Sequence, residues 1–198
     1  MNIESKRELF TLICSGDVAG IKKFLGDNAS KAVGVTNDRG STPLHAAASA
    51  GEVDVARFLM QKGADVNVTD NWGYTPLHNA CTYGHIDMVK LLLRKGAKIN
   101  ALTHHNLTPL HKAVIKGSVD VVGELLSNKA DVNALDRHHC SGLHTAALNG
   151  NLPLVKLLVE AGAKINAENI EGETPVYWAK KYKHHECVKY LTMRGATA

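Results

Sequence analysis

The sequence repeats itself every 33 residues, and this period limits the possible folds more than any other feature. A four-residue anchor occurs at Thr42–His45, Thr75–His78 and Thr108–His111, with weaker copies at Ser141–His144 and Thr174–Tyr177. Other residues recur in the same frame: Gly51, Gly84, Gly117 and Gly150; Gly63, Gly96, Gly162 and Gly195; and Asn67, Asn100, Asn133 and Asn166. Recurrence in phase over most of the chain indicates copies of one structural unit that stack side by side.

Each copy has the pattern of two short helices joined by turns. The anchor threonine is a good helix N-cap, and the proline after it suits the first helical position, where no backbone hydrogen bond is lost. The first helix is expected to end at a glycine such as Gly51. A second helix has a broad apolar face, with Met88, Val89 and Leu92 in one copy, and should end at Gly96 in a left-handed cap. The polar segment between copies is expected to form an extended hairpin that projects from the helices.

The copies divide the chain into six units. A unit of this kind buries its apolar face only against a neighbour, so the two terminal units are expected to be caps. We predict an all-α repeat solenoid that forms a single domain over residues 1–198. Its parts are an N-terminal capping repeat (1–37), four internal repeats (38–169) and a C-terminal capping repeat (170–198).

The motif Thr-Pro-Leu-His, followed in frame by glycine, a pair of leucines and Gly-Ala-Asp-Val-Asn, resembles the ankyrin repeat family over essentially the whole chain. The resemblance implies that each unit is a β-hairpin finger followed by two antiparallel helices. It also implies that the anchor histidine rings hydrogen-bond backbone between a finger and its neighbours. In the family, the fingers and first helices form a concave surface that binds proteins. No reaction is common to the family, so the resemblance implies a binding module.

Several positions depart from the repeat. Ser141 and Gly142 replace Thr-Pro, which should loosen the start of that helix. Lys129 replaces the glycine that ends the second helix, at a cost of about 1 kcal/mol for a left-handed lysine. Asn106 and His139 replace a glycine of the finger.

The recurring asparagines close the segment that leads into each finger. We interpret them as turn residues whose side chains bond the local backbone. The resemblance leaves a second interpretation open, since such positions can be hydroxylated in the family.

The composition is that of an ordinary soluble protein, with 44% apolar and 21% charged residues. No apolar run reaches the roughly 18 residues of a membrane-spanning helix, and the N-terminus has no apolar region typical of a secretory signal. The four cysteines form no Cys-x-x-Cys pair, so we expect reduced thiols and a cytoplasmic or nuclear location.

The formal charge of +4 matches the excess of basic residues between Lys180 and Arg194. A basic terminus of this kind can contact nucleic acid. We favour the simpler interpretation that it is the solvated face of a terminal helix.

The 11 histidines suggest a metal or catalytic site, but their spacing argues against both. The anchor histidines have the structural role given above. His138, His139 and Cys140 lack the second pair of ligands that a tetrahedral zinc site needs. Neither a phosphate-binding glycine loop nor a nucleophile motif is present. We therefore predict no metal, no cofactor and no enzymatic activity.

Binding should depend on the positions that differ between copies, since the stacking positions are fixed by the fold. These positions are the finger tips and the ends of the first helices, and Trp and Tyr there are typical of binding hot spots. Trp178 either extends this surface or covers the end cap. The predicted partner-binding residues are Arg39, Trp72, Tyr74, Tyr83, His105, Leu107, Lys116 and His138.

Within that set, Trp72, Tyr74, Tyr83 and Leu107 are expected to form one cluster. Arg39, His105, Lys116 and His138 are expected to give the surface a mildly positive, pH-sensitive edge.

We predict a monomeric adaptor or scaffold that binds a partner protein through this concave surface, with no small-molecule substrate and no membrane. One alternative is a regulatory inhibitor of an enzyme or transcription factor. A second alternative, less favoured, is a protein that contacts nucleic acid through its basic end.

Overall fold

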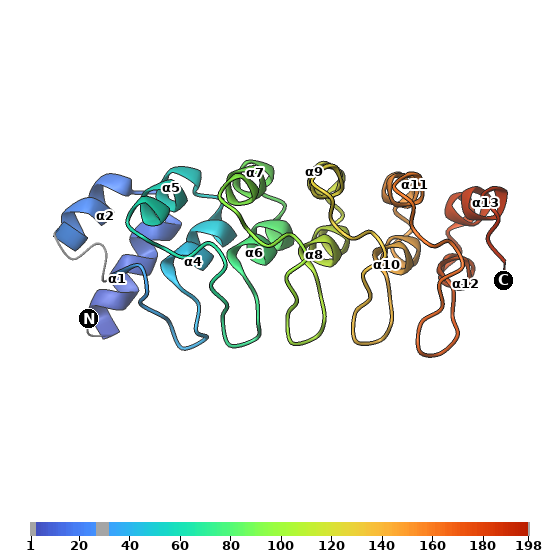
Figure 1. Ribbon diagram of the computed structural model, residues 1–198, viewed down its shortest axis with the longest axis horizontal. Helices are drawn as coiled ribbons and strands as arrows, with labels where there is room; N and C mark the ends of the chain where they lie inside the picture. The colour runs from blue at the N-terminus through green and yellow to red at the C-terminus, as the bar shows by residue number, and fades with distance from the viewer. Residues whose placement is uncertain (1–2, 27–31, 198) are drawn as a thin grey trace. The chain divides into compact units, whose positions relative to one another are not determined.

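The computed structural model describes residues 3–26 and 32–197 and contains two compact units, Met1–Lys98 and Ile99–Ala198, which are described separately (Figure 1). The predicted capping repeat 1–37 is therefore described over residues 3–26 and 32–37, and the rest of it lies outside the described residues.

Both units consist of helix pairs. The helices of the first unit are α1 (Ile3–Cys14), α2 (Val18–Leu25), α4 (Pro43–Ala50), α5 (Val53–Gln61), α6 (Pro76–Tyr83) and α7 (Ile86–Arg94). Those of the second unit are α8 (Pro109–Lys116), α9 (Val119–Ser127), α10 (Gly142–Leu148), α11 (Leu152–Glu160), α12 (Pro175–Lys181) and α13 (His185–Met193). Residues 3–26 and 32–197 contain no strand, and the predicted all-α repeat fold is confirmed. None of the described helices is long and apolar enough to cross a membrane.

The core of each unit lies between the helix layers. On α4, Leu44, Ala47 and Ala48 are fully buried, as expected for a small-residue face that lets another helix approach closely. On α7, Met88 and Val89 are fully buried. The broad apolar face predicted for the second helix is therefore the face that packs into the core.

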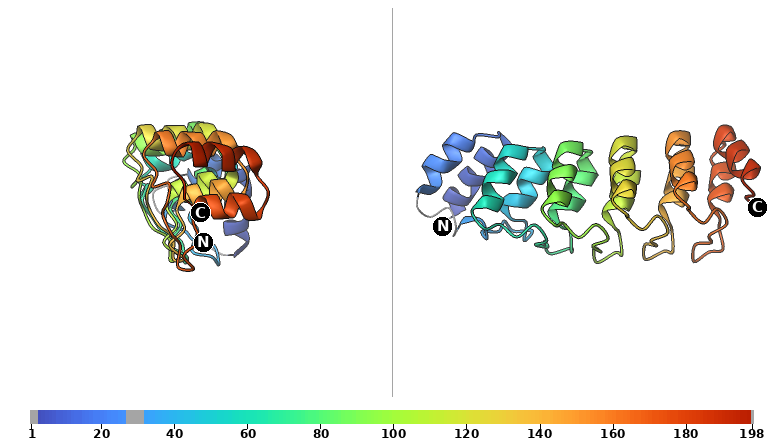
Figure 2. Two further views of the ribbon diagram at one scale, coloured as in Figure 1. Left: turned by 90° about the vertical axis from the view of Figure 1, so that its right-hand side faces the viewer. Right: turned by 45° about the horizontal axis from the view of Figure 1, so that its top comes forward.

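The fingers are hairpin-shaped loops without a regular strand ladder in the described residues, and in each unit they extend from one side of the helix pairs (Figure 2). Two backbone hydrogen bonds close each tip, for example from Asp70 N to Tyr74 O at 2.9 Å and from Gly73 N to Asp70 O at 3.0 Å. Backbone bonds also join adjacent fingers within a unit, such as the 3.1 Å bond from Asn71 N to Arg39 O.

Each finger tip is shaped by the side chain of its first residue. Asp70 Oδ1 accepts hydrogen bonds from Trp72 N at 3.0 Å and Tyr74 N at 2.9 Å. The same pair of bonds is made by Asn37, Thr103, Asp136 and Asn169. This side-chain turn leaves the next residues of the tip free to vary.

The anchor histidines join each helix start to the following finger. In the first unit, Nδ1 of His45 lies 2.9 Å from Oγ1 of Thr42 and accepts the Thr42 N–H at 3.1 Å. Its Nε2 donates to the carbonyl of Tyr74, 29 residues later, at 2.9 Å. His111 and His144 make the same contacts in the second unit, at 3.3 Å to Cys140 O and 3.2 Å to Glu173 O. The histidine role implied by the family resemblance is confirmed for these three residues.

The recurring asparagines bridge consecutive repeats, so the prediction that they bond the local backbone was wrong. Asn67 Nδ2 donates to Gly96 O at 3.1 Å, and its Oδ1 accepts from Lys98 N at 2.8 Å. Asn133 makes the equivalent bonds to Gly162 O and Lys164 N. Each asparagine therefore lies beside the end of the second helix of the next repeat. The spacing in the sequence alone did not reveal this contact.

The replaced glycines keep the left-handed backbone of the repeat. Lys129 has φ 67°, Asn106 has φ 56° and His139 has φ 58°. Lys183, at the position of Gly150 one repeat earlier, has φ 59° and was not singled out from the sequence. Each of these residues adopts a conformation that costs a non-glycine residue about 1 kcal/mol.

The expected loose start of α10 is not observed. Ser141 Oγ lies 2.9 Å from His144 Nδ1, the same distance as at the threonine caps, and the helix begins at Gly142. Serine keeps the hydroxyl that the cap needs, and this is why the geometry is unchanged.

Replacing Gly142 with proline should stabilise the chain by about 0.5–1 kcal/mol, because proline restricts the unfolded chain at a position that needs no N–H. Ser141 has ψ 170°, which suits a residue before proline. A Cβ at Gly142 would meet Val114 and Leu158 at ordinary contact distances of 3.5 Å and 3.8 Å. Urea unfolding of G142P and wild type tests this, and a loss of stability would contradict it. The control is G142A, which should gain less stability than G142P.

Stability should fall as the pH drops below about 6.5. Burial lowers the pKa of His45, His111 and His144 below the ordinary value of 6.5, although the hydrogen bond to a carbonyl opposes this effect. Between the lowered pKa and 6.5, the unfolded chain therefore binds more protons than the folded chain. In this range each histidine lowers the free energy of unfolding by up to about 1.4 kcal/mol for each pH unit of acidification.

Denaturant unfolding at pH 7.5 and pH 5.5 measures this effect. H144Q should be less stable than wild type at pH 7.5. Its stability should fall less than that of wild type on acidification, because glutamine does not titrate. Equal stability of the wild-type chain at both pH values would contradict the role of the neutral rings.

Candidate functional site

Several aromatic residues that differ between repeats are exposed, whereas the repeated anchor residues such as Thr42, Leu44 and His45 are buried. Trp72 is 45% exposed and Tyr83 is 54% exposed, although large aromatic side chains usually lie mostly inside. Neither residue takes part in the anchor or asparagine contacts described above. The candidate binding surface therefore comprises the finger tips and the first helices of each unit.

In the first unit, the finger tips present Arg39 and Trp72. Both side chains are exposed, and the backbone carbonyl of Arg39 accepts the bond that joins the two fingers. Tyr74 is half-buried, with its ring centroid 5.7 Å from that of His78, and its carbonyl accepts from His45. Tyr74 therefore contributes to the framework as well as to the surface.

Trp72 and Tyr83 lie at opposite ends of α6. Trp72 belongs to the finger that precedes the helix, and Tyr83 is the last helical residue. Eight helical residues span about 12 Å, so the backbones of the two aromatic residues are separated by the length of the helix. Tyr83 stacks on His85, with ring centroids 6.2 Å apart.

In the second unit, His105 and His138 are brought together by an arginine that the sequence analysis did not include. Arg137 Nε donates to His138 Nε2 at 3.0 Å, and Arg137 Nη1 lies 3.1 Å from His105 Nδ1. The backbone bond from Arg137 N to His105 O, at 3.2 Å, holds the two fingers at this spacing. These three exposed side chains form one polar patch on adjacent finger tips.

The other two predicted residues of the second unit lie apart from this patch. Leu107 is half-buried at the residue that closes its finger tip, where its N–H donates to Thr103 Oγ1 at 3.1 Å. Lys116 is exposed at the last position of α8.

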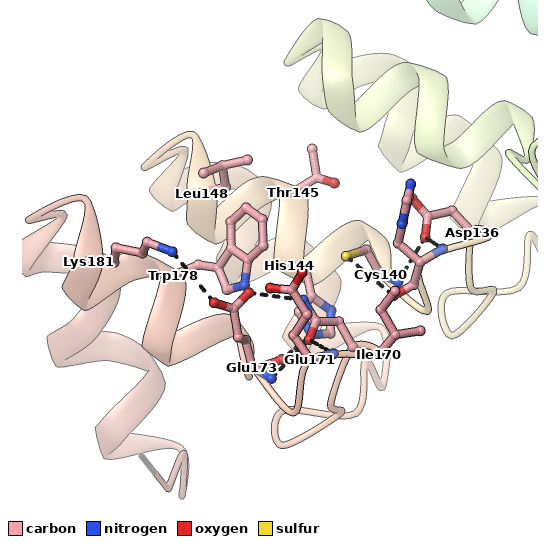
Figure 3. Close-up of a pocket in the computed structure, with 12 residues that line it drawn as sticks. Asp136, Cys140, His144, Thr145, Leu148, Ile170, Glu171, Glu173, Trp178 and Lys181 are labelled. Atoms are coloured by element: carbon pink, nitrogen blue, oxygen red, sulfur yellow. Dashed lines mark hydrogen bonds and ion pairs between the residues drawn. The ribbon is translucent and has the colours of Figure 1, made fainter.

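A pocket of ≈ 370 Å³ lies between the last finger and the first helices of the second unit, and the sequence analysis did not predict it (Figure 3). Its apolar wall contains Leu148, Ile170 and Trp178, of which Ile170 is 58% exposed. Trp178, for which the sequence leaves open an extension of the binding surface or a cover for the end cap, forms part of this pocket. The signal for the pocket lay in Trp178, which stands where the preceding repeats have Thr145 and Lys112.

Charged residues surround the pocket. Asp136, Glu171 and Glu173 supply carboxylates, and Lys181 supplies an ammonium group. Lys181 Nζ lies 3.5 Å from Glu173 Oε1 and 5.3 Å from the centre of the Tyr177 ring. Three carboxylates against one lysine leave the pocket lining acidic.

The cysteine at the edge of the pocket remains a thiol. Burial raises the pKa of Cys140, and the negative charges of Asp136, Glu173 and Glu171 raise it further, against the effect of a hydrogen bond with Asn169. A protonated thiol is a weak nucleophile. In residues 3–26 and 32–197, no three His, Cys, Asp or Glu side chains converge closely enough to hold a metal ion. The arrangement is suited to recognition by contact and charge.

The comparison with protein families gives three matches to one family model. That model, described as ankyrin repeats in three copies, matches residues 9–103, 69–136 and 110–198. Together the matches cover residues 9–198. A search of curated proteins found no significant match.

Proposed function

This chain belongs to the ankyrin repeat family, and we propose that it is an adaptor or scaffold that binds a partner protein through its finger tips and first helices. Ankyrin repeats are generally protein–protein interaction modules. The more specific role is our proposal, as are the absence of enzymatic activity and the absence of a bound cofactor.

The observation that supports it most is the separation of framework and surface residues. His and Asn at repeated positions make side-chain bonds between consecutive repeats within each unit, and the repeated Thr residues cap the first helices. Exposed aromatic side chains such as Trp72 and Tyr83 occur at positions that differ between repeats. Exposed Trp and Tyr side chains bury large areas on binding and are frequent hot spots. Since the framework does not use them, they are available to a partner.

Replacing both Trp72 and Tyr83 with alanine should weaken partner capture at least tenfold, since hot-spot truncations cost about 2 kcal/mol or more. Thermal unfolding should hardly change, because exposed side chains outside the framework contribute about 0.5 kcal/mol or less to stability. Affinity purification from the source cell, quantified by mass spectrometry, measures capture, and calorimetry measures stability.

Arg94→Ala provides the matched control, because Arg94 is also exposed but lies at the end of a second helix. It should capture the same partners as wild type. A marked loss of stability in W72A/Y83A, or unchanged capture, would show that these residues are not the binding surface. An activity assay on the captured partner would then separate a regulatory inhibitor from a scaffold.

A further inference from the structure

We propose that the pocket beside Trp178 binds an arginine side chain from an extended segment of the partner protein. This inference rests on the proposed function and adds the chemistry of the partner at one site.

The charge of the pocket favours a cation. Glu173 is engaged by Lys181 at 3.5 Å and by Asn169 Nδ2 at 3.1 Å. Glu171 is exposed, and its side chain forms no ion pair within the described parts of the chain. Asp136 uses Oδ1 to cap its own finger. The carboxylate of Glu171 and the second oxygen of Asp136 therefore remain for a partner.

The pocket already contains one cation, Lys181, which contacts aromatic rings and a carboxylate as the partner arginine would. Lys181 Nζ lies 5.9 Å from the centre of the Trp178 ring and 5.3 Å from that of Tyr177, and it pairs with Glu173. A ring face beside a carboxylate is the combination that attracts organic cations. The internal contact is independent evidence that this part of the surface is suited to positive charge.

Arginine fits this pocket better than lysine. Its planar guanidinium group can stack on the indole of Trp178 and bind a carboxylate such as Glu171 through two parallel hydrogen bonds. The apolar wall formed by Leu148 and Ile170 suits the methylene groups of the same side chain.

An extended segment suits the surroundings of the pocket. Ile115, one repeat before Leu148 in the same register, is 49% exposed and offers an apolar contact for a residue that neighbours the arginine. The indole Nε1 of Trp178 is buried and donates to no acceptor in the described residues. Buried donors normally have a partner. A small rotation of the indole would let a backbone carbonyl of the bound segment accept this hydrogen bond.

Selection from a phage-displayed library of random dodecapeptides on the full 198-residue chain tests the proposal. The enriched peptides should share an arginine next to an apolar residue. Binding of these peptides, measured by fluorescence anisotropy, should weaken about tenfold in E171Q, since an arginine–carboxylate contact contributes about that factor. Trp178→Leu should weaken it at least as much.

Glu168→Gln is the matched control, because it removes the same charge from an exposed residue outside the pocket lining. It should bind the peptides as wild type does. Peptides without arginine, peptides with lysine alone at the shared position, or equal binding by E171Q and E168Q would overturn the proposal. Peptides that ignore Glu171 and need Trp72 and Tyr83 would overturn it while supporting the proposed function. A chain that selects no peptide and captures no partner would count against both.

Lys181→Met tests whether the pocket binds a positively charged group. Removing the internal cation should strengthen binding of the arginine peptides a few-fold, because it makes the pocket more acidic and frees Glu173. Weaker binding in K181M would mean that Lys181 itself contacts an acidic partner, and it would overturn the proposal. Thermal unfolding of each variant confirms that the fold is intact.

Discussion

The contact on which the rest of the structure depends is the bridge made by a neutral, buried histidine. Its Nδ1 accepts from the threonine that starts its own helix, and its Nε2 donates to a carbonyl of the next finger, as in the bond from His45 to Tyr74 O. Both ring nitrogens are used, so the ring satisfies three polar groups in a buried place where an unpaired group would be costly. The ring can do this only if consecutive repeats keep one spacing.

Because these bridges recur at one spacing, the same type of side chain joins consecutive repeats within a unit, beside the backbone bonds between adjacent fingers. The asparagines add a second set of bonds at the other end of the finger segment, from Asn133 to Gly162 O and Lys164 N. The chain tolerates local departures as long as these bonds persist. Ser141 keeps its hydroxyl, and Lys129 and His139 accept a left-handed backbone in place of glycine. Exposed residues outside both sets of bonds, such as Trp72, can change without loss of these contacts, and they form the surface.

Most of the fold could be predicted from the sequence, whereas only part of the candidate site could. The period, the caps and the left-handed positions depend on local backbone geometry, which residue type reveals directly. The asparagine contacts and the association of His105 with His138 through Arg137 join residues about 30 positions apart. A pattern along one copy cannot show such pairs. The same limit applies to Trp72 and Tyr83, which are close in sequence but are separated by the length of α6.

The sequence alone determined the repeat, its 33-residue length and the residues that start and end each helix, because these depend on interactions within a few positions. Tertiary structure decided which side chains meet. It placed the carboxylates of Asp136 and Glu171, from two different fingers, in the lining of the pocket that also contains Trp178 on a first helix. A pocket of this kind exists only when neighbouring repeats are placed side by side, since each repeat contributes only part of its wall and charge.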